Sequence, residues 1–153
     1  MDISPTEPSE IIKGLWVGDM FTAKDPEFFR SNNIGAVLNC TLELPNYFVS
    51  NNIEYLRLSV NDILDPQDAV NMRNYLPVAV WFLYKNHDME GKNVFIHCHR
   101  GVQRSVTSCV AYLYKTRHRN LKEVINYVVS KRNIAYFGGH QNNFEEVLNA
   151  FCS

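Results

Sequence analysis

A cysteine and an arginine that could form a phosphate site, Cys98 and Arg104, stand in the segment VFIHCHRGVQRS with five residues between them. An apolar run typical of a buried strand precedes the cysteine, and an amphipathic helical pattern follows the arginine. A loop that leaves a strand and enters a helix directs several backbone N–H groups at one point, at the positive end of the helix dipole. The segment therefore predicts an anion site, in which Cys98 is favoured as thiolate and acts as nucleophile.

The neighbours of these two residues fit the same chemistry. The guanidinium of Arg104 is a planar fork that matches two oxygens of a phosphate, and Gly101 permits the left-handed backbone that such a loop requires. Ser105 can donate a hydrogen bond to the sulfur when it leaves, and His97 is expected to orient the loop. The loop is expected to bind the phosphate and to stabilise the charge that develops on it in the transition state. The loop residues are His99, Arg100, Gly101, Val102, Gln103 and Arg104.

A general acid must protonate the leaving oxygen, and three carboxylates precede the loop: Asp62, Asp65 and Asp68. Asp65 precedes Pro66 and is best explained as a helix N-cap, which places Asp68 in the first turn. Asp62 ends the strand-like EYLRLSV, so it can lie at the same sheet edge as Cys98. Asp62 is the predicted acid, and Asp65 remains the alternative.

Hydrophobic patterning predicts the elements that position these residues. Strands are expected at 15–20, 36–41, 54–60 and 94–98, of which the second and fourth are apolar enough to be central. Helices are expected from residue 26 with Asp25 as cap, from 66 with a kink or restart at Pro77, over 106–114, from 121 with Asn120 as cap, and over 144–151. Lys131 and Arg132 suit the negative end of the helix that begins at 121. Strands that alternate with helices predict an α/β fold with a partly parallel sheet.

Composition narrows the class of protein. The chain has 153 residues, 46% of them apolar and 20% charged, which predicts one globular domain over 11–153 preceded by a loosely ordered arm over 1–10. The formal charge of −1 argues against non-specific nucleic-acid binding. No apolar run could span a bilayer, and the start lacks an export signal. The four cysteines are scattered without CxxC pairs and are expected to be reduced thiols of an intracellular protein, cytoplasmic or nuclear, without a metal site.

The segment HCHRGVQRS resembles the signature HCxxGxxRS of the dual-specificity protein phosphatases. The similarity extends to IIKGLWVGD, IGAVLNCTLELPN, IEYLRLSVND, EGKNVFIHC and LKEVINYVVSKR. It implies a mixed sheet of four to five strands flanked by helices, no metal or other cofactor, a phospho-cysteine intermediate, and a shallow pocket that admits phosphotyrosine and phosphoserine or phosphothreonine. The low-molecular-weight phosphatases carry their Cys-x5-Arg at the start of the chain, so they fit less well. The family also places its acid after the strand that Asp62 ends, although the 36 residues from Asp62 to Cys98 are more than is usual.

The resemblance implies a phosphoprotein substrate, with a signalling kinase as one candidate partner. His99 and Arg100 are interpreted as a solvated rim. The alternative is that they select polyanionic substrates, which would favour an RNA 5′-phosphatase or a phosphoinositide phosphatase on the same scaffold. A third hypothesis is that the protein is a non-catalytic phosphopeptide-binding module. The presence of both Cys98 and Arg104 disfavours it.

Overall fold

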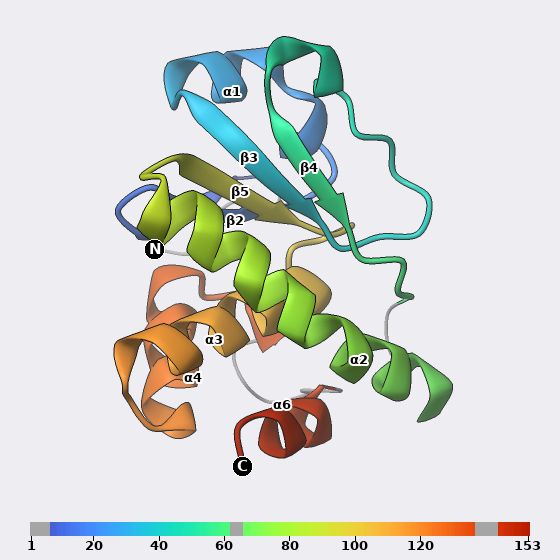
Figure 1. Cartoon of the computed structure of the whole chain (residues 1–153), viewed down its shortest axis with the longest axis vertical. Coiled ribbons are helices and arrows are strands. Elements are labelled where there is room, and N and C mark those ends of the chain that lie inside the picture. Colours follow the sequence, from blue (N-terminus) through green and yellow to red (C-terminus); the bar gives the residue numbers. More distant parts are fainter. Residues whose placement is uncertain (1–6, 62–65, 137–143) are drawn as a thin grey trace.

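A five-stranded sheet runs through the computed structural model, which describes residues 7–61, 66–136 and 144–153 (Figure 1). The order across the sheet is β1-β2-β5-β3-β4. The pairs β2–β5, β5–β3 and β3–β4 are parallel, and β1 is antiparallel to β2, so the predicted mixed sheet is confirmed. The strands are β1 (Ser9–Ile12), β2 (Leu15–Gly18), β3 (Ile34–Asn39), β4 (Glu54–Arg57) and β5 (Asn93–His97).

Strand β5 lies at the centre of the sheet and is covered on both faces. Its residues Val94, Phe95 and Ile96 are completely buried. Because side chains alternate along a strand, Phe95 packs on one face, against α1 (Pro26–Ser31), while Val94 and Ile96 belong to the larger core on the other face. The nearly continuous apolar runs that predicted two central strands thus correspond to β3 and β5, the two that pair with each other.

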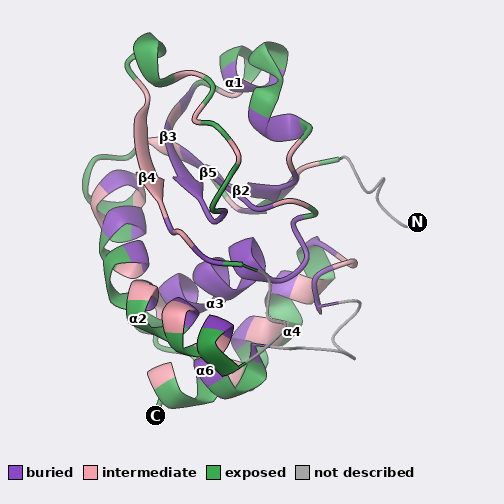
Figure 2. Cartoon of the chain, turned by 90° about the vertical axis from the view of Figure 1, so that its right-hand side faces the viewer, coloured by how far each residue is buried: buried purple, intermediate pink, exposed green. Residues whose placement is uncertain are grey.

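The other helices lie together on the second face of the sheet (Figure 1). Helix α3 is the most deeply placed, with ten of its fourteen residues buried, and Figure 2 shows it buried along most of its length. Helix α3 follows β5 after the loop of residues 98–103. These helices are α2 (Pro66–Leu83), which continues as a π-helix over Tyr84–Met89, α3 (Arg104–Arg117), α4 (Leu121–Lys131) and α6 (Glu145–Phe151).

Two helix caps and one proline test the local predictions. Asp25 accepts a hydrogen bond from the backbone N–H of Glu27, and Asn120 accepts one from that of Glu123, so both predicted caps are confirmed. Of the two outcomes expected at Pro77, a kink or a restart, the restart is wrong, because helix α2 runs unbroken through that residue. Burial of the side chains on the sheet side of α2 compensates for the one backbone hydrogen bond that proline removes.

Strand β1 begins at Ser9, inside the segment expected to be a loose arm. Ser9 and Glu10 pair with Val17 and Trp16 of β2, and Ile11 is almost fully buried beneath the helices. The short run SEII has no pattern of its own that distinguishes a strand, since its pairing partner decides its conformation. Across the described ranges, no helix is both long and apolar enough to cross a membrane.

Candidate active site

Residues 98–103 connect the carboxyl end of β5 to the start of α3. β5 ends at His97 between β2 and β3, and α3 begins at Arg104. Cys98 is 3% exposed, and its backbone follows directly from the buried strand. The strand-loop-helix arrangement expected around Cys98 is therefore present, at the edge of the sheet where all four parallel strands end.

The carbonyl groups of this loop are held by donors from outside it. The N–H of Met20 donates to the His99 carbonyl at 2.9 Å, and that of Tyr136 donates to the Val102 carbonyl at 2.9 Å. The Gly101 carbonyl accepts from Arg132 at 2.8 Å. In a trans peptide the N–H points opposite to the C=O. The loop N–H groups are therefore turned away from these donors, as an anion-binding nest requires.

Gly101 occupies a position that no other residue type fits. Its φ is +68°, in the left-handed region where a side chain causes strain. A Cβ built there would lie 2.6 Å from the carbonyl oxygen of Gly18 and 2.6 Å from Nη2 of Arg132. The glycine thus allows the loop to pack directly against the end of β2.

Arg132 supports the loop from its buried side, a role the sequence did not indicate. It is completely buried, although it stands at the end of α4, where it was expected only to offset the helix dipole. Its Nε donates to the Gly101 carbonyl at 2.8 Å, and its Nη1 donates to the Glu7 carbonyl at 2.8 Å and to Ser9 Oγ at 3.0 Å. Burial lowers the pKa of this guanidinium. Arg132 therefore ties the loop to the first strand.

Cys98 and Ser105 face each other across the base of the loop. The Cys98 Sγ and Ser105 Oγ atoms are 3.1 Å apart, and the Ser105 side chain is completely buried. A hydroxyl at that distance can donate to a sulfur that carries negative charge. The expected contact between these two side chains is thus present in the structure.

Arg104 stands at the first position of α3 and is nine-tenths buried. Its Nη1 donates to the Val60 carbonyl at 3.0 Å, which links the loop to the chain that follows β4. Its Nε is buried and has no hydrogen-bond partner among residues 7–61, 66–136 and 144–153. A buried guanidinium donor without an acceptor is costly. An anion held above the loop would supply that acceptor.

His97 is uncharged at neutral pH. Burial lowers its pKa to about 4, because the protonated ring would be removed from water and placed near other cationic groups. The ring stacks on Phe95 with the centroids 5.5 Å apart, and Nδ1 lies 3.4 Å from the Cys98 carbonyl. These contacts are those of a residue that fixes the orientation of the loop.

The rim of the loop carries His99 and Arg100, and a carboxylate lies against it. The Glu43 carboxylate contacts Nε2 of His99, and Arg100 is exposed. Glu43 comes from the loop after β3, which sequence reasoning did not connect with the site. The segment TLELPN contains no chemical motif, so only the tertiary structure reveals the contact.

The two candidate acids, Asp62 and Asp65, lie outside the described residues. The first described range ends at Asn61, directly after Val60, whose carbonyl accepts the hydrogen bond from Arg104. Asp62 follows Val60 by two residues in the sequence and Asp65 by five.

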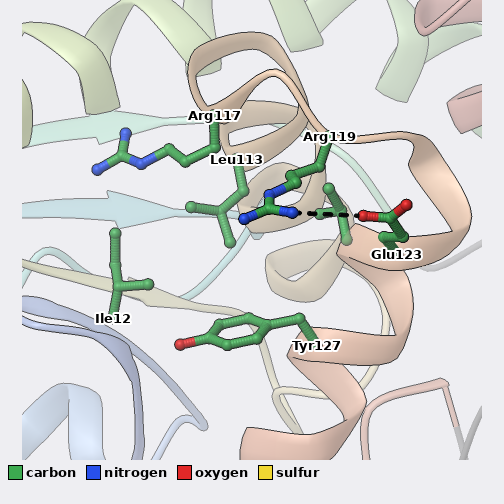
Figure 3. A pocket seen from close by; sticks show the side chains of 7 residues that line it. Ile12, Leu113, Arg117, Arg119, Glu123 and Tyr127 are labelled. Carbon is green, nitrogen blue, oxygen red and sulfur yellow. Dashed lines mark ion pairs between the residues drawn. The ribbon is translucent and has the colours of Figure 1, made fainter.

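No group of three metal-ligating side chains was found within the described ranges. A cavity of about 310 Å³ lies away from the loop, between the end of α3, the start of α4 and β1 (Figure 3). Arg117, Arg119 and Tyr127 are among its lining residues, and none of the predicted site residues is. This cavity is therefore separate from the loop around Cys98.

Residues 15–150 match the family described as dual specificity phosphatase, catalytic domain. The mouse dual specificity protein phosphatase 1 is 30% identical over 151 residues, covering 95% of this chain and 40% of that protein. The Drosophila melanogaster dual specificity protein phosphatase Mpk3 is 35% identical over 127 residues, covering 82% of this chain and 30% of that protein. The chain thus spans less than half the length of these relatives.

Solved structures resemble this one over nearly its whole length. DUSP15 superimposes with a TM-score of 0.82 at 22% identity, covering 96% of this chain and 88% of that one. Human DUSP28 superimposes with a TM-score of 0.77 at 18% identity, covering 98% and 95%. At these identities the similarity establishes the fold.

Proposed function

The chain belongs to the dual specificity phosphatase family, and from this we propose that it hydrolyses phosphotyrosine and phosphoserine or phosphothreonine in proteins through a phospho-cysteine intermediate. The observation that carries the proposal is the Nε of Arg104, which is buried and has no hydrogen-bond partner among the described residues. Arg104 begins the helix that follows the loop after Cys98, and the N–H groups of this loop are turned away from the donors that hold its carbonyl groups. A phosphate dianion satisfies both sets of donors, and the bidentate geometry suits Arg104.

In the first step the Cys98 thiolate attacks the phosphorus of the bound substrate. The S–P bond forms as the bond from phosphorus to the serine, threonine or tyrosine oxygen breaks. That oxygen is a poor leaving group, so it takes a proton from a carboxylic acid, for which we propose Asp62. Arg104 and the loop N–H groups stabilise the charge that spreads over the three equatorial oxygens.

In the second step water attacks the phospho-cysteine, and the S–P bond breaks. The Asp62 carboxylate, which gave up its proton in the first step, accepts one from this water. Ser105 Oγ, 3.1 Å from the sulfur, donates a hydrogen bond to the thiolate that leaves. Inorganic phosphate is released and the free thiolate is restored. Asp65 is the alternative acid, and mutation of each carboxylate distinguishes the two.

The substrates we propose are phosphoproteins inside the cell. The four cysteines are all unpaired, and three are buried, which fits a reducing compartment. Both the cytoplasm and the nucleus are consistent with this proposal. We expect the partner to be a signalling kinase. This kinase either phosphorylates the substrate or is itself the phosphoprotein substrate.

The proposal is tested by measuring turnover on phosphotyrosine and phosphothreonine peptides, inositol phosphates and 5′-triphosphorylated RNA with one enzyme preparation. We expect turnover of both peptides. Cys98→Ser should lower kcat at least ~10³-fold while peptide binding persists, because the nucleophile is lost and Arg104 remains. Cys152→Ser, which removes a partly exposed thiol near the end of the chain, is the matched control. Hydrolysis of RNA or inositol phosphates alone, or full activity of Cys98→Ser, would refute the proposal.

A further inference from the structure

The loop that carries Glu43, residues 41–46, is fixed by buried polar groups beneath it. Asn39 is completely buried, and its Nδ2 donates to the Leu44 carbonyl at 2.8 Å. Its Oδ1 accepts from the backbone N–H of Thr41 at 3.1 Å and from the Thr41 hydroxyl at 2.7 Å. Asn39 therefore holds both halves of the Glu43 loop.

Arg57 fixes the same loop from the neighbouring strand. Its Nη1 donates to the Thr41 carbonyl at 2.9 Å, and its Nη2 donates to the Leu44 carbonyl at 2.7 Å. The Thr41 hydroxyl also accepts from the backbone N–H of Leu44 at 3.1 Å. With Thr41 and Leu44 fixed, the backbone on both sides of Glu43 has little freedom, so its carboxylate has a defined place.

That place is beside the phosphate-binding loop. The Glu43 carboxylate contacts His99, whose own backbone is held by Met20, and both side chains remain partly exposed. Burial by itself would raise the pKa of Glu43, but the hydrogen bond with His99 and the charges of His99 and Arg104 outweigh it and hold the pKa below its usual value. Glu43 therefore carries a negative charge within electrostatic reach of the guanidinium that would bind phosphate.

We propose that Glu43 is a specificity-determining residue that disfavours a second negative charge beside the phosphate of the substrate. This inference rests on the proposed phosphatase function. By themselves, Arg100 and a protonated His99 on the loop would attract acidic or doubly phosphorylated sequences. Glu43 offsets that attraction, because it occupies His99 and repels an anion that approaches the same rim. The preferred substrates carry one phosphate, with a neutral or basic residue next to it.

The test uses three phosphotyrosine peptides that differ only at the residue after the phosphotyrosine, which is Lys, Ala or Glu. We compare kcat/KM of the wild type with that of Glu43→Gln, which keeps the shape and an acceptor oxygen but removes the charge. The matched control is Glu27→Gln. Glu27 is an exposed carboxylate of α1, which precedes β3 and so lies toward the opposite edge of the sheet from the loop.

We expect the wild type not to favour the Glu peptide over the Lys peptide. In Glu43→Gln the ratio of kcat/KM for the Glu peptide to that for the Lys peptide should rise about three- to tenfold, the effect of one partly screened charge. The rise should come mainly from the Glu peptide, should shrink at high ionic strength, and should be absent in Glu27→Gln. A loss of fold or of loop geometry would lower kcat/KM for all three peptides together and leave the ratio between them unchanged.

Binding supplies a second measurement. In a Cys98→Ser background, the affinities for the three peptides should shift in the same direction when Glu43 is replaced by Gln. An unchanged ratio in both measurements, with normal turnover by the wild type, would overturn the role of Glu43 and leave the proposed function intact. Absence of turnover of every phosphopeptide by the wild type would refute the proposed function and this inference with it.

Discussion

Arg132 provides the sharpest test of how the loop is supported. Replacement by methionine keeps an unbranched side chain of similar length and removes every donor. Four hydrogen bonds are lost, to the carbonyl groups of Gly101, Glu7 and Arg100 and to Ser9 Oγ. Each bond from a charged donor contributes ~1.5–3 kcal/mol, but the guanidinium recovers its hydration on unfolding, so we expect a net loss of ~3–5 kcal/mol.

The free energy of unfolding is measured by urea denaturation, and kcat/KM is measured on a phosphopeptide. Arg132→Met should lower both, because the carbonyl of Gly101 is released and the loop N–H groups lose their orientation. Arg132→Lys keeps the charge without the fork, and its loss should be about half as large. The control Arg119→Met changes a surface arginine whose side chain is 70% exposed, and we expect a change within ~0.5 kcal/mol. If Arg132→Met unfolds within ~1 kcal/mol of the wild type with unaltered kcat/KM, the support we infer for the loop does not exist.

Three further predictions concern the acid, the buried histidine and the loop glycine. Asp62→Asn should lower the rate of phosphoserine-peptide hydrolysis ~10²–10⁴-fold, and the rate for aryl phosphates with acidic phenols much less. Asp65→Asn should lower only the free energy of unfolding, by ~1 kcal/mol. The reverse pattern would assign the acid to Asp65. Folding lowers the pKa of His97 to about 4, so as the pH falls His97 is protonated in the unfolded chain before it is protonated in the folded one. The free energy of unfolding should therefore decline from pH ~6.5 toward 4, by up to ~3 kcal/mol. The matched His97→Gln variant should show a correspondingly shallower decline in urea titrations at each pH, and parallel curves would contradict this. Gly101→Ala should lose at least ~2 kcal/mol and most activity, because the new Cβ meets the Gly18 carbonyl at 2.6 Å in left-handed backbone; a variant as stable as the wild type would show that the end of β2 can move away.

Local patterns in the sequence were sufficient for the parts of the protein that depend on neighbouring residues. The strand before Cys98, the helix after Arg104 and the caps at Asp25 and Asn120 all depend on residues within about one turn of each other, so their side-chain spacing predicts them. The five-residue spacing of Cys98 and Arg104 is also local, since a single loop between two elements contains both.

The tertiary structure decided which distant groups meet that loop. Arg132 follows Gly101 by 31 residues, and Glu43 precedes His99 by 56, so no periodic pattern relates either pair. In the sequence, Arg132 is indistinguishable from a surface cation at a helix end. It is buried only because α4 packs beside α3 and brings the residue at its C-cap under the loop.

Strand β1, at the edge of the sheet, also depends on tertiary contacts rather than on its local sequence. A β-strand is stabilised by hydrogen bonds to a partner, so SEII at β1 acquires its conformation only from pairing with β2. Helix α2 likewise continues through Pro77 because the packing of its buried face outweighs the local preference of one residue. The sequence by itself determined the strand-loop-helix segment around Cys98 and the fold class, since these follow from local propensity and hydrophobic pattern. The support of the loop by Arg132 and the carboxylate at its rim were decided by long-range packing, because their partners are brought together only when the whole chain folds.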